Sequence, residues 1–89
     1  MQVETWVVAD EYDDAALARL KVALSDLQYT FRHRWSAIIG SQDVRQWEAV
    51  GPGGRLIIES ETYMGLSVEG SASLVAELQA LYEKASQDS

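Results

Sequence analysis

The sequence predicts an α+β fold, a two-layer sandwich in which a mainly antiparallel sheet of about four strands carries two helices on one face. Two leucine-rich segments with helical spacing and a central segment with two-residue alternation are the observations behind this prediction. The chain has 89 residues, of which 47% are hydrophobic and 24% charged. This length and composition are typical of one globular domain. We expect residues 1–85 to form it, in the order strand, helix, three or four strands, helix.

The first two predicted elements lie in residues 3–27. Residues 3–9 are almost continuously apolar, which is typical of an interior strand buried on both faces. An acidic stretch follows, and negative charge suits the first turn of a helix. A helix over residues 15–27 is then indicated by four leucines at spacings of three, four and three residues: Leu17, Leu20, Leu24 and Leu27.

The middle of the chain predicts a meander. Residues 28–39 alternate with period two, which assigns to the core face a row that contains the single histidine: Tyr29, Phe31, His33, Trp35, Ala37 and Ile39. A turn at 40–43 leads to an antiparallel partner over 44–50, and a glycine-rich turn at 51–54 leads to a further strand over 55–60. Residues 62–68 either continue that strand through a bend or form a separate strand.

A last helix follows residues 69–73, where serines are available as caps. Its apolar stripe is formed by Leu74, Val75, Leu78, Leu81 and Tyr82. Residues 86–89 contain nothing to bury, so we expect this tail to fray.

Charge is unevenly distributed along the chain. There are 14 acidic and 7 basic residues, for a net charge of -7, yet residues 28–57 hold four arginines against two acids. An acidic chain repels phosphate backbones and anionic lipid surfaces, so we expect neither duplex DNA nor a membrane as a partner. Four carboxylates gather at the start of the first helix and form the predicted surface for a basic protein partner: Asp10, Glu11, Asp13 and Asp14.

Several classes of chemistry lack the residues they require. The chain has no cysteine, which excludes disulfides, thiolate zinc sites and a cysteine nucleophile. His33 has no second histidine beside it, and the acidic stretch lacks the glycine and distal glutamate of a calcium loop. We therefore predict no enzyme activity, catalytic residue, metal or cofactor. No apolar run approaches a membrane span, and the N-terminus lacks signal-peptide features, so we expect a cytoplasmic protein.

By elimination, the sequence predicts a non-enzymatic acidic protein-binding module. In composition alone it resembles bacterial toxin-immunity proteins and phage-encoded inhibitors, which cover basic sites with carboxylates; this implies an inhibitor or immunity-type protein docking on a basic partner. One alternative is a homo-oligomeric structural or accessory domain. Another is a binder of small molecules or single-stranded nucleic acid through arginine and tryptophan on a sheet face, with Arg32, Arg34, Arg45 and Trp47 as its residues. Trp47 lies either on that face or in the core.

Overall fold

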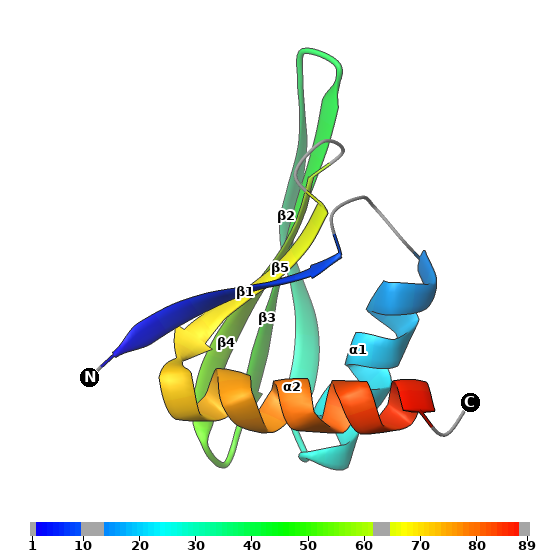
Figure 1. Cartoon of the computed structure of the whole chain (residues 1–89). Helices are drawn as coiled ribbons and strands as arrows, with labels where there is room; N and C mark the ends of the chain where they lie inside the picture. Colours follow the sequence, from blue (N-terminus) through cyan, green and yellow to red (C-terminus); the bar gives the residue numbers. More distant parts are fainter. Residues whose placement is uncertain (1, 10–13, 62–64, 88–89) are drawn as a thin grey trace.

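The protein forms a five-stranded antiparallel sheet with two helices packed on one face (Figure 1). The computed structural model describes residues 2–9, 14–61 and 65–87. The strand order is β1-β5-β4-β3-β2. This confirms the α+β prediction, with five strands in place of about four. The elements are β1 (Val3–Ala9), α1 (Asp14–Asp26), β2 (Thr30–Ile39), β3 (Gln42–Gly51), β4 (Gly54–Glu61), β5 (Gly65–Ser71) and α2 (Ala72–Gln87).

Both helices bury the leucine stripes that their spacing predicts. Leu20 and Leu24 of α1 and Leu78 of α2 are fully buried against the sheet. The Ser71 side-chain oxygen accepts a hydrogen bond from the backbone N–H of Leu74 at 3.4 Å, which confirms a serine cap at the start of α2. This helix runs to Gln87 and so enters the segment 86–89 that we expected to fray. None of the helices in the described ranges is long and apolar enough to cross a membrane.

The first strand lies at an edge of the sheet, so the prediction of an interior strand over residues 3–9 is wrong. β1 pairs with β5, and Val3 and Val7 are exposed on the face away from the helices. Trp6 and Val8 pack against the core from the other face. The apolar run therefore reflects one buried face and one exposed valine-bearing face, because no helix among the described residues covers that side of the sheet.

A β-bulge interrupts the alternation of β2. His33 pairs with Trp47 and Trp35 pairs with Gln46, which leaves Arg34 as the extra residue. Each side chain beyond the bulge therefore lies on the opposite face from the one that simple alternation assigns. Trp35 is 40% exposed on the face away from the helices, so the predicted core row of Tyr29, Phe31 and Trp35 is wrong at Trp35.

The segment over residues 55–68 resolves into two strands. β4 and β5 pair antiparallel, from Ile57 opposite Glu69 to Glu61 opposite Gly65. Residues 62–64, between the two strands, lie outside the described ranges. Pairing back, rather than bending, brings the carboxylates of β4 and β5 onto one surface.

The β2–β3 hairpin is the longest element pair, with 10 residues in each strand. Its outer part, residues 33–47, projects beyond the helical layer, and we call it the arm (Figure 1). Toward its tip the helix-facing side of the arm is exposed, at Ser36, Ile38 and Arg45, whereas at its base Trp47 is buried in the core. The arm supplies side chains to both candidate surfaces described below.

Candidate functional site

The sheet face opposite the helices, called the open face, carries a row of side chains that crosses all five strands. Strand pairing places at its centre Glu59 of β4, which lies between Gln46 of β3 and Ser67 of β5. Trp35 and Val7 occupy the two ends of the row, on the edge strands β2 and β1. An aromatic side chain and a carboxylate therefore stand on one rigid surface, separated by a single amide.

Hydrogen bonds connect three members of this row. The indole Nε1 of Trp35 donates to Oε1 of Gln46 at 3.0 Å, and Nε2 of Gln46 donates to Oε2 of Glu59 at 3.2 Å. The Gln46 amide thus fixes the indole and the carboxylate at once. A large aromatic surface held in this way loses little further conformational freedom when a partner covers it.

Glu59 and Glu61 form a close pair of like charges on β4. Both point to the open face because Ile58 and Ser60, the alternate residues, are buried on the helix side. The pKa of Glu61 is raised, chiefly by its hydrogen bond with Glu59, and further by burial and by the negative charge of Glu59. Within the described ranges neither carboxylate forms an ion pair. When both carboxylates are ionised they repel each other, and a bound cation would lessen that repulsion.

The remaining open-face acids have other surroundings. Glu48 lies next to Arg55, whose Nε is 2.5 Å from its Oε2, and Arg32 sits directly opposite Glu48 on β2. Glu69 is exposed on β5 beyond Ile57. Glu48 is therefore neutralised within the chain. Glu59, Glu61 and Glu69 have no ion pair within the described residues, and Glu59 and Glu61 are the two that form a close pair.

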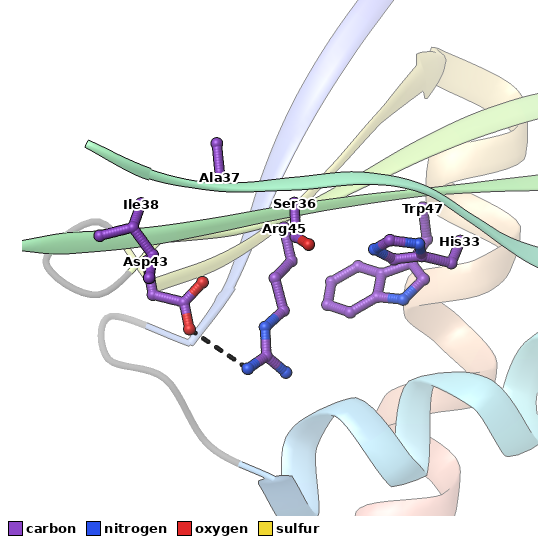
Figure 2. A pocket seen from close by; sticks show the side chains of 7 residues that line it. All are labelled: His33, Ser36, Ala37, Ile38, Asp43, Arg45 and Trp47. Atoms are coloured by element: carbon purple, nitrogen blue, oxygen red, sulfur yellow. Dashed lines mark hydrogen bonds and ion pairs between the residues drawn. The ribbon is translucent and has the colours of Figure 1, made fainter.

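A second feature lies on the helix-facing side of the arm, where a cavity of about 630 Å³ opens (Figure 2). Its polar centre is Arg45, whose Nη2 is 3.2 Å from Oδ2 of Asp43. Trp47 closes the inner end, stacked on Phe31 at 5.8 Å between ring centroids and edge-on to His33 at 6.4 Å. The seven residues lining the cavity are His33, Ser36, Ala37, Ile38, Asp43, Arg45 and Trp47.

The structure separates the four residues predicted as an arginine and tryptophan platform. Trp47 is 7% exposed and belongs to the core, and Arg45 shares its face in the cavity. Arg32 is paired opposite Glu48 on the open face, and Arg34 is the extra residue of the bulge. These four side chains do not form one surface, so the stacking platform proposed from alternation has no counterpart in the fold.

Of the predicted acidic surface, one residue can be placed. Asp14 is exposed at the first position of α1, and Asp10, Glu11 and Asp13 lie outside the described residues. His33 lines the arm cavity and contacts Trp47, as its place in an aromatic row suggested. Among the residues that the structure describes, no group of three His, Asp or Glu side chains is arranged to hold a metal.

The sequence contains a pattern that locates the two carboxylates of the open-face site, whereas the pattern around Trp35 is misleading. Glu59 and Glu61 flank buried Ser60 with a period of two, a pattern that places both on the solvent side of a strand. Trp35 was missed because its exposure depends on the bulge at Arg34. Comparison of the chain with models of protein families, with curated proteins and with solved structures found no match.

Proposed function

We propose that the protein is a non-enzymatic protein-binding module that docks on a basic protein partner through its open face. The observation that carries the proposal is the pair of unneutralised carboxylates, Glu59 and Glu61, next to the tethered indole of Trp35. An inhibitor or immunity-type role follows from such a surface, because a module seated on basic residues blocks whatever those residues bind. The partner is therefore expected to use cationic side chains in its own activity.

An arginine of the partner fits the chemistry of this surface. Its guanidinium has five N–H donors and a flat face, so it can bind the carboxylates of Glu59 and Glu61 while it stacks on Trp35. A cation placed over an exposed indole contributes about 0.5–1 kcal/mol, and each exposed ion pair about 0.2–1 kcal/mol. Tryptophan and arginine are also the residues most often found at the energetic centre of interfaces.

The decisive experiment compares two charge-matched double variants. The probe is a short arginine-rich peptide, titrated into the isotopically labelled full chain and followed by amide chemical shifts. Glu59→Gln with Glu61→Gln removes two charges from the open face, and Glu77→Gln with Glu83→Gln removes two from the helical layer. We expect the first variant to weaken binding by about 2- to 30-fold, from two exposed ion pairs, and the second to leave it nearly unchanged.

Two further measurements complete the test. The same peptide with citrulline in place of arginine should bind poorly, because citrulline keeps the shape and loses the charge. Trp35→Ala should also weaken binding. The amide signals that lose their peptide-induced shifts should be the same as in the double variant of Glu59 and Glu61. Equal weakening by the two double variants would refute the proposal, since binding would then follow net charge alone.

The helix-start hypothesis from the sequence is a rival outcome of the same experiment. Substituting Asp10, Glu11, Asp13 and Asp14 with their amides should have little effect on the peptide's affinity if the open face is the site. Loss of binding in that variant, with normal binding by the variant of Glu59 and Glu61, would move the interface to the start of α1.

A further inference from the structure

We infer that the arm cavity is a binding site for a small monocarboxylate that carries an apolar or aromatic body. The cavity lies on the helix-facing side of the sheet, whereas Trp35, Glu59 and Glu61 lie on the open face. The two sites are therefore independent, and the inference does not rest on the proposed protein partner.

Strand pairing orders the cavity into a polar centre between two less polar ends. His33 lies opposite Trp47 at the inner end, Ser36 lies opposite Arg45 in the middle, and Ile38 lies opposite Asp43 at the outer end. The side chains of Arg45, Asp43 and Trp47 project from the same side of β3, into the space between the arm and α1 (Figure 2). A ligand in this space meets the polar centre and an apolar wall together.

The polar centre has more hydrogen-bond donors than acceptors. Arg45 has five N–H groups, one of its nitrogens contacts Asp43 at 3.2 Å, and Ser36 adds a hydroxyl. Among the described residues that line the cavity, Asp43 is the carboxylate, and Arg45 already contacts it. Only one nitrogen of the guanidinium contacts Asp43, so the other N–H groups can donate to a ligand. The complementary ligand supplies acceptor oxygens.

Charge selects a carboxylate over a phosphate. Arg45 and Asp43 cancel each other locally, and the whole chain carries a net charge of -7. A dianion is repelled more strongly by this field than a monoanion. A single carboxylate on Arg45 therefore meets the donors at the smaller electrostatic cost.

The shape and polarity of the cavity favour a ligand whose carboxylate is attached to an apolar body. Ile38 is 80% exposed at the outer end of the cavity, near the tip of the hairpin. Trp47 adds apolar surface at the inner end of the cavity. The volume of about 630 Å³ lies within the range of small-molecule sites, roughly 300–1,000 Å³. A ring or branched chain attached to the carboxylate would cover Ile38.

The test uses benzoate as the probe, with benzyl alcohol and inorganic phosphate as comparators, titrated into the labelled full chain. We expect benzoate to give saturable amide shifts confined to the arm, with a Kd on the order of 1–10 mM for so small a ligand. Benzyl alcohol and phosphate should each bind more weakly, because one lacks the charge and the other lacks the apolar body.

Two substitutions and one control locate the site. Arg45→Gln should weaken benzoate binding about tenfold or more, as expected for a charge-assisted hydrogen bond. Arg34→Gln removes the same charge from the neighbouring bulge, outside the cavity lining, and should leave benzoate binding unchanged. Ile38→Ala changes an exposed side chain, so it cannot unfold the domain, and it should weaken benzoate severalfold without affecting acetate.

Several results would overturn the inference. These are non-saturable or dispersed shifts with benzoate, equal losses in the variants of Arg45 and Arg34, or phosphate binding as tightly as benzoate. Glu59→Gln with Glu61→Gln should bind benzoate normally, so failure at the arm cavity and failure at the open face are recognised separately.

Discussion

Replacing Trp47 and Trp35 with alanine, one at a time, tests the bulge that determines both candidate surfaces. Trp47 is 7% exposed and stacked on Phe31, whereas Trp35 is 40% exposed with its indole nitrogen bonded to Gln46. A tryptophan buries about 150–250 Å² when fully covered, which at about 25 cal/mol per Å² corresponds to an upper limit of about 4–6 kcal/mol. Trp47→Ala also removes the stacking contact with Phe31 and enlarges the inner end of the arm cavity, so a loss of about 3–5 kcal/mol is expected.

The corresponding loss for Trp35→Ala is about 1–2 kcal/mol. Less area is covered at Trp35, the lost hydrogen bond is exposed, and the vacated space opens to water, so no internal cavity forms. Against a total stability of about 4–13 kcal/mol for a domain of this length, the Trp47 variant should be close to unfolding and the Trp35 variant should not.

Urea denaturation followed by far-UV circular dichroism measures both losses without depending on tryptophan fluorescence. Free energies extrapolated to water, with slopes checked for two-state behaviour, give the comparison directly. Equal losses would refute the reasoning, because they would place Trp35 and Trp47 in the same core. The strand would then alternate without interruption at Arg34, and neither the open-face row nor the arm cavity would exist.

Three further outcomes are expected in the same assay. Leu78→Ala, at a fully buried position in α2, should lower the free energy of unfolding by about 2–5 kcal/mol. A loss below about 0.5 kcal/mol would contradict its place in the core. Gly51→Ala should cost about 1–3 kcal/mol, because its Cβ would lie 2.6 Å from ring carbons of Tyr29; an unchanged midpoint would show that the ring moves freely. The pKa of Glu61 is raised in the folded protein, so ionisation of its carboxylate opposes folding increasingly as the pH rises from the ordinary pKa to the raised one, and fully above it. Glu61→Gln should therefore raise the urea midpoint at neutral pH. This gain should vanish below about pH 4, where the wild-type side chain is protonated in both the folded and the unfolded state. A gain that does not depend on pH would exclude repulsion from Glu59 as its cause.

Much of the fold is local in origin and was predictable for that reason. The helical spacing of Leu20 and Leu24 requires one buried stripe, and the alternation around Trp47 and Ala49 requires a strand with one buried face. The cap at Ser71 likewise depends on a side chain and a backbone group three residues apart. None of these features needs information about which strand pairs with which.

The errors concern features that depend on pairing. Residues on both sides of Arg34 keep a period of two, so the sequence shows the alternation and conceals the inserted residue that shifts its phase. The apolar run around Val7 is compatible with either an interior or an edge strand until the strand order is known. Both errors move hydrophobic side chains from the predicted core to the open face, which is why the candidate surface contains Trp35.

The distribution of charge along the sequence also differs from its distribution on the folded surface. Arginines cluster in the middle of the sequence, yet strand pairing sets Arg32 and Arg55 next to Glu48 on the same face as later acids. A count of acids therefore does not locate the binding surface, because carboxylates on both layers contribute to the net charge of -7. What separates Glu59 and Glu61 from Glu48 is the lack of a neighbouring cation within the described residues. A like-charged pair held on a rigid strand raises the energy of the free protein, and a partner's guanidinium would recover that energy on binding. The proposed docking would therefore gain part of its favourable energy from the close placement of Glu59 and Glu61 on β4.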